Sequence, residues 1–112
     1  MTVWSVYLVR AAGGVIYTGI ATDVDRRIDE HRAGRGAKYL RGRAPMTVVF
    51  RRRLGDRGLA LRLERRLKRM KKTEKEALVR ARPSLRRLLA MLERGRTATS
   101  RSTSFRASAP AS

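Results

Sequence analysis

The sequence contains no cysteine among its 112 residues. This absence excludes a disulfide-stabilised scaffold, a zinc site with thiolate ligands and a cysteine nucleophile. It suits a reducing compartment, so we expect a cytoplasmic protein. The chain also lacks an apolar run of 18 or more residues, and Met1 to Val9 shows no basic start followed by a long apolar stretch. We therefore expect neither a membrane-spanning helix nor a signal peptide.

Acidic residues are scarce, with 9 Asp and Glu against 28 Lys and Arg, which gives a formal net charge of +19. Such a charge predicts a polyanionic partner, and nucleic acid is the first class to consider, including association with the nucleoid. Only five of the cations are lysines and 23 are arginines. Arginine grips phosphate bidentately, but a GC-rich genome also favours arginine codons, so the arginine excess alone supports phosphate binding weakly.

The chain length predicts one domain and a tail. Residues 1–82 contain the alternating and periodic apolar patterns of a folded domain, and residues 83–94 follow as a helical extension after Pro83. Residues 95–112 contain eight Ser or Thr, three Arg and no acid. A segment of this composition buries little apolar surface, so we expect a disordered basic tail.

A β-hairpin is expected at the N-terminus, with strands over 3–9 and 15–20 joined by the turn signal Ala-Ala-Gly-Gly. Both faces of the first strand carry apolar side chains, which predicts that the sheet is covered on both sides. A third strand is expected over 46–53.

Helices are expected over 23–33, 59–70, 74–82 and 85–92. The first has Val24, Ile28 and His31 on one face, and Thr73 with Glu76 has the spacing of a capping box for the third. The predicted fold class is α+β: a small three-stranded, mostly antiparallel sheet flanked by helices.

The chemistry-bearing residues follow a recognisable order along these elements. Ser5-Val6-Tyr7 lies in the first strand, Tyr17-Thr18-Gly19 in the second, and the next helix has an Arg-x-x-x-His pattern at Arg27 and His31, with Glu64 in a later helix. This combination resembles the GIY-YIG nuclease family.

The stretch from about 4 to 79 is similar to the small stand-alone bacterial branch of that family, and the runs at 36–42 and 55–61 add to the similarity. The resemblance implies a GIY-YIG-like fold and an endonuclease that cleaves DNA, in repair or processing. Ser5-Val6 replaces the Gly-Ile of the family name. These positions supply strand packing rather than chemistry, so the implied activity is kept.

Glu64 is the candidate metal ligand. Cleavage of a phosphodiester needs an activated water and stabilisation of charge on the phosphoryl oxygens. One carboxylate can hold a single Mg²⁺ or Mn²⁺ when waters and a substrate phosphate complete the shell, and Glu64 is the only acid between Asp56 and Glu74. The alternative is a solvated helix charge paired with Lys68 at i+4.

Arg27 and His31 are one helical turn apart and project from the same face. Arg27 can hold the scissile phosphate, and His31 can transfer a proton near neutral pH. The alternatives are one more surface arginine and a packed histidine.

Tyr7 and Tyr17 must share a face of the sheet if both act in catalysis. A four-residue loop that pairs Arg10 with Val15 would place the rings on opposite faces, whereas an odd loop such as 11–13 places Tyr7 opposite Tyr17. We therefore expect an odd loop or a bulge, and a close backbone approach at Gly19.

The identity of the general base stays open between Tyr7 and His31. The resemblance favours a tyrosinate-type base at the first tyrosine. The pKa of a free phenol is ~10, so a shift of about three units, or about 4 kcal/mol, by nearby positive charge is expected.

Residues 31–55 contain eight cations and no acid, and they are expected to flank the cleft and follow a nucleic-acid backbone. Tyr39 in this segment can stack on a base. A late lysine, Lys71 or Lys72, is the candidate to complete the site. The candidate nucleic-acid-binding residues are Arg35, Lys38, Tyr39, Arg41, Arg43 and Lys71.

Two functional hypotheses follow. The first is a metal-dependent nuclease with Tyr7, Tyr17, Arg27, His31 and Glu64 in its site, acting on DNA, with RNA as the other option. The second is a non-catalytic nucleic-acid-binding protein on the same scaffold. A membrane-surface protein is disfavoured because the arginines are spread over strands and loops rather than one helix face.

Overall fold

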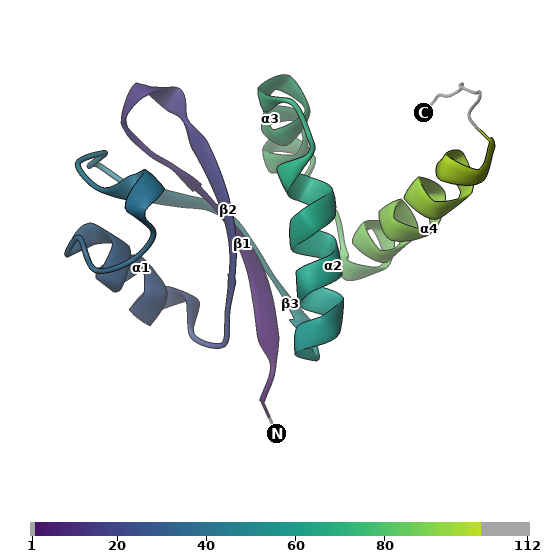
Figure 1. The fold of residues 1–112 in the computed structure, drawn as a ribbon, viewed down its shortest axis with the longest axis horizontal. Helices are drawn as coiled ribbons and strands as arrows, with labels where there is room; N and C mark the ends of the chain where they lie inside the picture. The colour runs from purple at the N-terminus through teal and green to yellow at the C-terminus, as the bar shows by residue number, and fades with distance from the viewer. Residues whose placement is uncertain (1, 102–112) are drawn as a thin grey trace.

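The computed structural model describes residues 2–101, which form a three-stranded sheet with helices on both of its faces (Figure 1). The α+β class predicted from the sequence is confirmed. The elements follow in the order β1 (Trp4–Arg10), a 3-10 turn η1 (Ala12–Gly14), β2 (Ile16–Ala21), α1 (Val24–Arg32), a 3-10 turn η2 (Lys38–Leu40), β3 (Thr47–Gly55), α2 (Arg57–Lys68), α3 (Lys72–Ala81) and α4 (Leu85–Arg101).

The sheet is antiparallel throughout, in the order β2-β1-β3. The central strand β1 is therefore the first element of the chain, and β2 and β3 form the two edges. The pairing of β1 with β3 shifts between Trp4 and Ser5 and again between Leu8 and Val9. These bulges add two residues to β3, which ends at Gly55 rather than at the expected Arg53.

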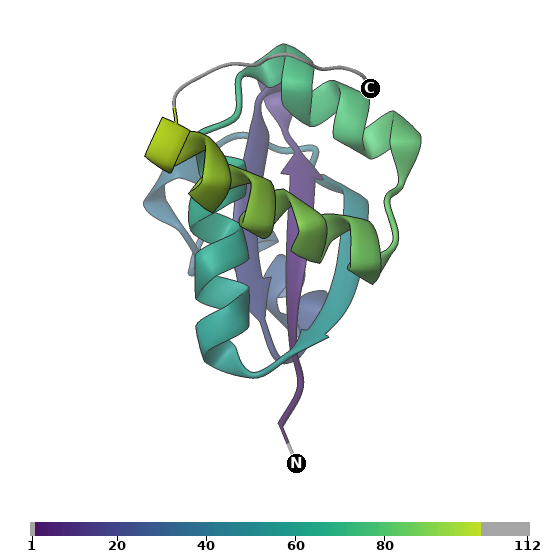
Figure 2. The same cartoon turned by 90° about the vertical axis from the view of Figure 1, so that its right-hand side faces the viewer.

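Each face of the sheet has its own apolar core, because successive side chains of a strand point to opposite faces. On one face, α1 and η2 cover the odd-numbered side chains of β1, such as Tyr7 and Val9. On the other, α2, α3 and α4 cover the even-numbered ones, such as Val6 and Leu8. Figure 2 shows α4 lying across α2 on the second face. The expectation that β1 is buried on both sides is confirmed.

Side-chain caps fix where α1 and α2 begin. Asp23 accepts a hydrogen bond from the Arg26 N–H at 3.1 Å, and Asp56 accepts one from the Leu59 N–H at 2.8 Å. Each cap satisfies a backbone donor that has no partner within the helix.

The expected capping box at Thr73 and Glu76 is wrong. Helix α3 starts two residues earlier, and the Glu74 carboxylate accepts the N–H of Lys71 at 2.7 Å. Glu76 instead forms ion pairs with Arg10 and with Lys72. Arg10 is a tertiary partner from β1 and Lys72 lies one turn earlier in α3, so Glu76 is engaged away from the expected cap.

Helix α4 continues to Arg101, past residue 95, where the disordered tail was expected to begin. Gly95 costs about 1 kcal/mol inside a helix, but propagation of an already formed helix adds one hydrogen bond per residue. The remaining expected tail, 102–112, lies outside the described residues. No helix within residues 2–101 is long and apolar enough to cross a membrane.

Candidate active site

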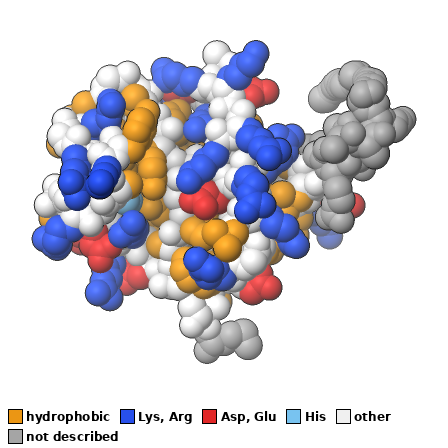
Figure 3. Space-filling model, viewed as in Figure 1, with side chains coloured by type: hydrophobic (Ala, Val, Ile, Leu, Met, Phe, Trp, Pro, Cys, Tyr) orange, Lys and Arg blue, Asp and Glu red, His pale blue; other side chains and the backbone are white. Residues whose placement is uncertain are grey.

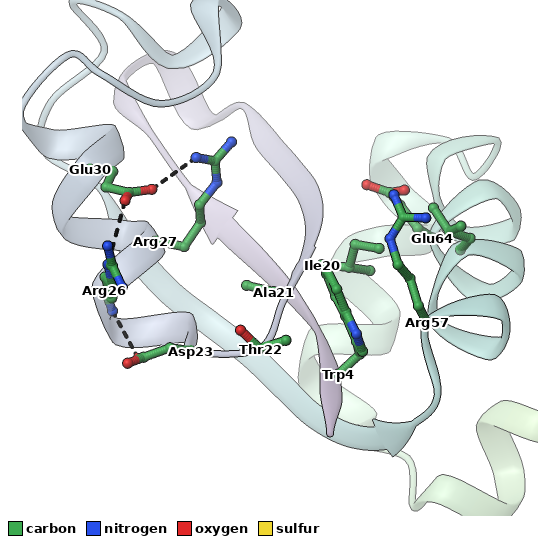
Figure 4. A pocket seen from close by; sticks show the side chains of 11 residues that line it. Trp4, Ile20, Ala21, Thr22, Asp23, Arg26, Arg27, Glu30, Arg57 and Glu64 are labelled. Atoms are coloured by element: carbon green, nitrogen blue, oxygen red, sulfur yellow. Dashed lines mark hydrogen bonds and ion pairs between the residues drawn. The ribbon is translucent and has the colours of Figure 1, made fainter. Parts of the chain in front are cut away.

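A cleft of about 500 Å³ opens at the free edge of β2, between α1 and α2. Helix α1 forms one wall and α2 the other, and Figure 4 shows Arg27 and Glu64 on these opposite walls. The fold therefore brings together two predicted site residues that are 37 positions apart in the chain. The lining residues are Trp4, Ile20, Ala21, Thr22, Asp23, Arg26, Arg27, Glu30, Arg57, Leu61 and Glu64.

Tyr7 is on the central strand and is not one of the residues that line the cleft, but Arg27 and Glu64 of the two walls both act on its pKa. Its side chain is fully buried, and its backbone pairs with Gly19 on β2. A Cβ atom on Gly19 would collide with the Tyr7 hydroxyl. The missing side chain thus lets the phenol ring cross over β2, which confirms the close approach expected at Gly19.

The two motif tyrosines lie on the same face, as the catalytic hypothesis requires. The hairpin loop has five residues, Ala11 to Val15, because Arg10 pairs with Ile16. The loop has an odd number of residues, as expected, but it is two residues longer than the loop 11–13. Tyr17 therefore lies diagonal to Tyr7 rather than opposite it. Gly13 and Gly14 adopt φ of 84° and 77° in this turn, a region that glycine reaches without strain.

His31 is buried and its protonation state is fixed by its two neighbours. The Ala37 N–H donates to Nδ1 at 3.0 Å, so Nδ1 carries no proton. Nε2 must then carry the proton, and it donates to the Tyr7 hydroxyl oxygen at 2.9 Å. Burial, reinforced by the Arg27 charge, lowers the pKa of His31 and keeps the ring neutral.

This arrangement makes His31 a hydrogen-bond donor to Tyr7 rather than an acceptor of its proton. The loop holds the ring tightly, because a Cβ on Gly36 would collide with the imidazole. Tyr17 also contacts the imidazole, edge-on, with the two ring centroids 5.6 Å apart.

The pKa of Tyr7 is raised to about 12, mainly by burial and next by the neighbouring Tyr17. Arg27 acts in the opposite direction, and Glu64 raises the pKa further. The expected net lowering by positive charge is therefore wrong for the protein alone, because the cost of burying a phenolate exceeds the attraction of one guanidinium. Tyr7 is therefore protonated at neutral pH.

Arg27 is already engaged by an acid on its own helix. Its Nη1 donates to Glu30 Oε1 at 2.9 Å, and Arg26 lies 3.7 Å from the other oxygen of the same carboxylate. These partners lower the pKa of Glu30, the Arg27 hydrogen bond most of all. A phosphate that binds Arg27 must compete with Glu30.

Glu64 lines the cleft and also forms the alternative ion pair, with Lys68 at 3.4 Å. Its side chain is only 17% exposed. No group of three or more His, Cys, Asp or Glu suited to hold a metal occurs within residues 2–101. A single carboxylate nevertheless fits Mg²⁺, which keeps several waters and uses substrate phosphate oxygens as further ligands.

The predicted nucleic-acid-binding residues lie outside the cleft lining. Tyr39 is the best placed of them: it is 52% exposed and stacks on Tyr17 at 6.2 Å, and Arg43 covers its ring at 4.8 Å. The other predicted cations are exposed in the segment between α1 and β3 or next to α3, namely Arg35, Lys38, Arg41 and Lys71.

Among the lysines late in the domain, Lys75 rather than the expected Lys71 or Lys72 contacts β2. Lys75 donates to the Ile16 carbonyl at 3.4 Å, and burial, then Lys68, lowers its pKa. Lys71 and Lys72, the predicted candidates, are exposed and do not line the cleft.

Trp4 and Arg57 line the cleft but were not predicted from the sequence. A usable signal exists for Arg57, which lies seven residues, or about two helical turns, before Glu64 and therefore on the same face of α2. Trp4 lies on the face of the sheet that α2 covers.

Comparison with known proteins decides the family. The model of the GIY-YIG catalytic domain matches residues 3–77, about two-thirds of the chain. This chain belongs to the GIY-YIG family. The match spans all five predicted site residues, from Tyr7 to Glu64, and ends within α3.

Similar GIY-YIG-type chains occur in several bacteria. The chain is 48% identical over 93 residues to the UPF0213 protein YhbQ of Salmonella typhimurium, covering 83% of this chain and 93% of that protein. It is 51% identical over 84 residues to a UPF0213 protein of Yersinia pestis, covering 75% and 88%. A UPF0213 protein from Bacillus halodurans with a solution NMR structure is 40% identical, with a TM-score of 0.47 over 70% of this chain and 84% of that one. These names state no substrate or activity.

Proposed function

We propose that this protein is a metal-dependent endonuclease that hydrolyses phosphodiester bonds in DNA, in repair or processing. The observation that carries the proposal is the placement of Arg27 and Glu64 on opposite walls of one cleft, within electrostatic reach of the buried Tyr7. Phosphodiester hydrolysis needs a cationic side chain that binds the phosphate, a carboxylate that can hold a metal ion and a group that transfers a proton.

Glu64 would hold one Mg²⁺ or Mn²⁺ in the cleft. When bound, the ion supplies positive charge for the phosphoryl oxygens and lowers the pKa of a bound water. Such a charge also offsets the unfavourable interaction of Glu64 with a Tyr7 phenolate. The low exposure of the carboxylate strengthens its interaction with a cation relative to a fully solvated one.

Arg27 binds the scissile phosphate, in exchange for Glu30, and stabilises the negative charge that develops on it. Tyr7, as the phenolate, accepts a proton from the attacking water. The water oxygen bonds to phosphorus, the bond from phosphorus to the leaving sugar oxygen breaks, and that oxygen takes a proton from solvent water. His31 stabilises the phenolate by donating from Nε2, and Tyr17 fixes the orientation of the imidazole.

The decisive experiment is a cleavage assay on labelled DNA substrates (single-stranded, duplex, flap and branched), with an RNA strand alongside. We expect cleavage with Mg²⁺ or Mn²⁺ and its loss on adding EDTA, because an ion held at Glu64 would supply positive charge for the phosphoryl oxygens and lower the pKa of a bound water. Tight, salt-sensitive binding without cleavage of any substrate would instead support the non-catalytic binding protein.

The pH dependence of the single-turnover rate distinguishes the two candidate bases. With Tyr7 as the base, the phenolate fraction grows with pH, so the rate is expected to rise ~10-fold per pH unit from about pH 6 to about pH 9. With His31 as the base, the rate would level off near or below ~6.5, because its pKa is lowered. A plateau throughout the neutral range would contradict the assignment of Tyr7.

A further inference from the structure

Trp4 and Arg57 form a second contact surface at the end of the cleft next to the start of β1. Trp4 is the first residue of β1 and is half-buried, and Arg57 is the first residue of α2 and is exposed. The guanidinium carbon of Arg57 lies 5.5 Å from the centre of the indole ring. Figure 4 shows Arg57 extending from the α2 wall beside Glu64, with the Trp4 side chain to its left.

The charge on Arg57 is uncompensated, unlike that of the cations on the α1 wall. Arg26 and Arg27 share the Glu30 carboxylate, and Glu64 is paired with Lys68. Arg57 has no ion pair within residues 2–101. Its neighbour Asp56 directs its carboxylate to the Leu59 N–H instead.

We propose that Trp4 and Arg57 bind the nucleotide next to the scissile phosphate. The proposal rests on the nuclease function proposed above, which places the scissile phosphate at Arg27 on the facing wall. A nucleic-acid strand that crosses the cleft must then pass the α2 wall, where Arg57 grips the neighbouring phosphate. Trp4 contacts the sugar or base attached to it, since an indole face suits both stacking and apolar contact.

This pairing of a cation with an aromatic side chain matches the two parts of a nucleotide. Arg57 supplies planar donors for the phosphate oxygens, and the Trp4 ring holds the guanidinium in place while leaving its N–H groups free. Both Lys and Arg side chains spread over this face of the molecule, and acidic side chains are fewer (Figure 3). Arg57 differs from most of them in lying inside the cleft itself.

The test is the salt dependence of DNA binding, measured by anisotropy without metal in the Glu64→Gln background, so that no cleavage occurs. Adding Arg57→Ala is expected to weaken binding ~10-fold, the value of one lost charge-assisted hydrogen-bonded contact. It should also reduce the slope of log K against log [salt] by ~0.7 for a single strand or ~0.9 for a duplex. The matched control is Arg62→Ala, which removes an equal charge from an exposed position of α2 outside the cleft.

Trp4 provides an independent readout because it is the only tryptophan in the chain. We expect its emission to be quenched as the oligonucleotide saturates the protein. An unchanged emission during binding, or an equal loss of slope in Arg62→Ala and Arg57→Ala, would overturn the proposal.

The outcomes also separate this site from the nuclease function. Quenching and a specific Arg57 effect without cleavage would keep the nucleotide-binding site and reject the endonuclease. Cleavage by the wild type, with no quenching of Trp4 and no change of the salt slope in Arg57→Ala, would keep the endonuclease and reject the nucleotide-binding site.

Discussion

Replacement of Tyr7 by phenylalanine is expected to lower the single-turnover rate of DNA cleavage by ~10²–10⁴-fold, the range for removal of a positioned proton-transfer group. The substitution keeps the ring that fills the space over Gly19 and removes only the hydroxyl. His31 cannot take over as base in its present tautomer, because Nε2 already carries the proton. The rate is measured with enzyme in excess over a labelled substrate.

The fold of Tyr7→Phe must be checked, since the variant leaves the Nε2–H of His31 without its partner, at a cost of about 1–3 kcal/mol. Thermal unfolding and metal-free DNA binding provide that check. The matched control is Tyr39→Phe, which removes a phenol hydroxyl from an exposed ring outside the cleft and is expected to cleave at nearly the wild-type rate. A folded, DNA-binding Tyr7→Phe protein with an unchanged rate would remove Tyr7 from the mechanism.

The substitution Glu64→Gln is expected to abolish the stimulation of cleavage by Mg²⁺ or Mn²⁺. The amide keeps the shape of the side chain but loses the charge that holds the ion, which is worth several kcal/mol to the reaction, or about 10³-fold in rate or more. The loss of the Lys68 ion pair adds little, because the lysine is half-exposed and such pairs contribute about 0–1 kcal/mol. The measurement is the cleavage rate against metal concentration.

Metal-free DNA binding by Glu64→Gln should be retained or slightly strengthened, because a negative charge leaves the cleft. Asp29→Asn is the control: it neutralises an exposed acid of α1 that does not line the cleft, and we expect its metal response to equal that of the wild type. A saturable metal dependence that survives Glu64→Gln would show that the ion binds elsewhere.

Periodicity was enough to predict the elements that position the site. The alternation in β1 indicated burial on both faces, and the stripe of Val24, Ile28 and His31 indicated the buried side of α1; all three side chains are buried. The sequence also allowed the prediction that the hairpin loop has an odd number of residues if Tyr7 and Tyr17 share a face, because a one-residue shift in strand pairing moves every side chain to the other face.

Features that depend on contacts distant in sequence escaped prediction. The tautomer of His31 is fixed by the N–H of Ala37 in a loop, and the pKa of Tyr7 is set mainly by burial, which no local pattern reports. Trp4 and Arg57 meet only because α2 packs beside the start of β1. Helix α3 begins after Lys71 rather than after Thr73, and Glu76 is engaged by a tertiary ion pair with Arg10 that no local pattern reports.

Because the cleft lies at the free edge of β2, the two edge strands of the sheet, β2 and β3, differ in what can bind to them. A strand from another molecule could extend the sheet only at an edge, where backbone donors and acceptors are unpaired. Along β2 such an added strand would occupy the path of the substrate and cover the cleft between α1 and α2. Self-association through β2 and access of DNA to the cleft therefore exclude each other, whereas the margin at β3 leaves the cleft open.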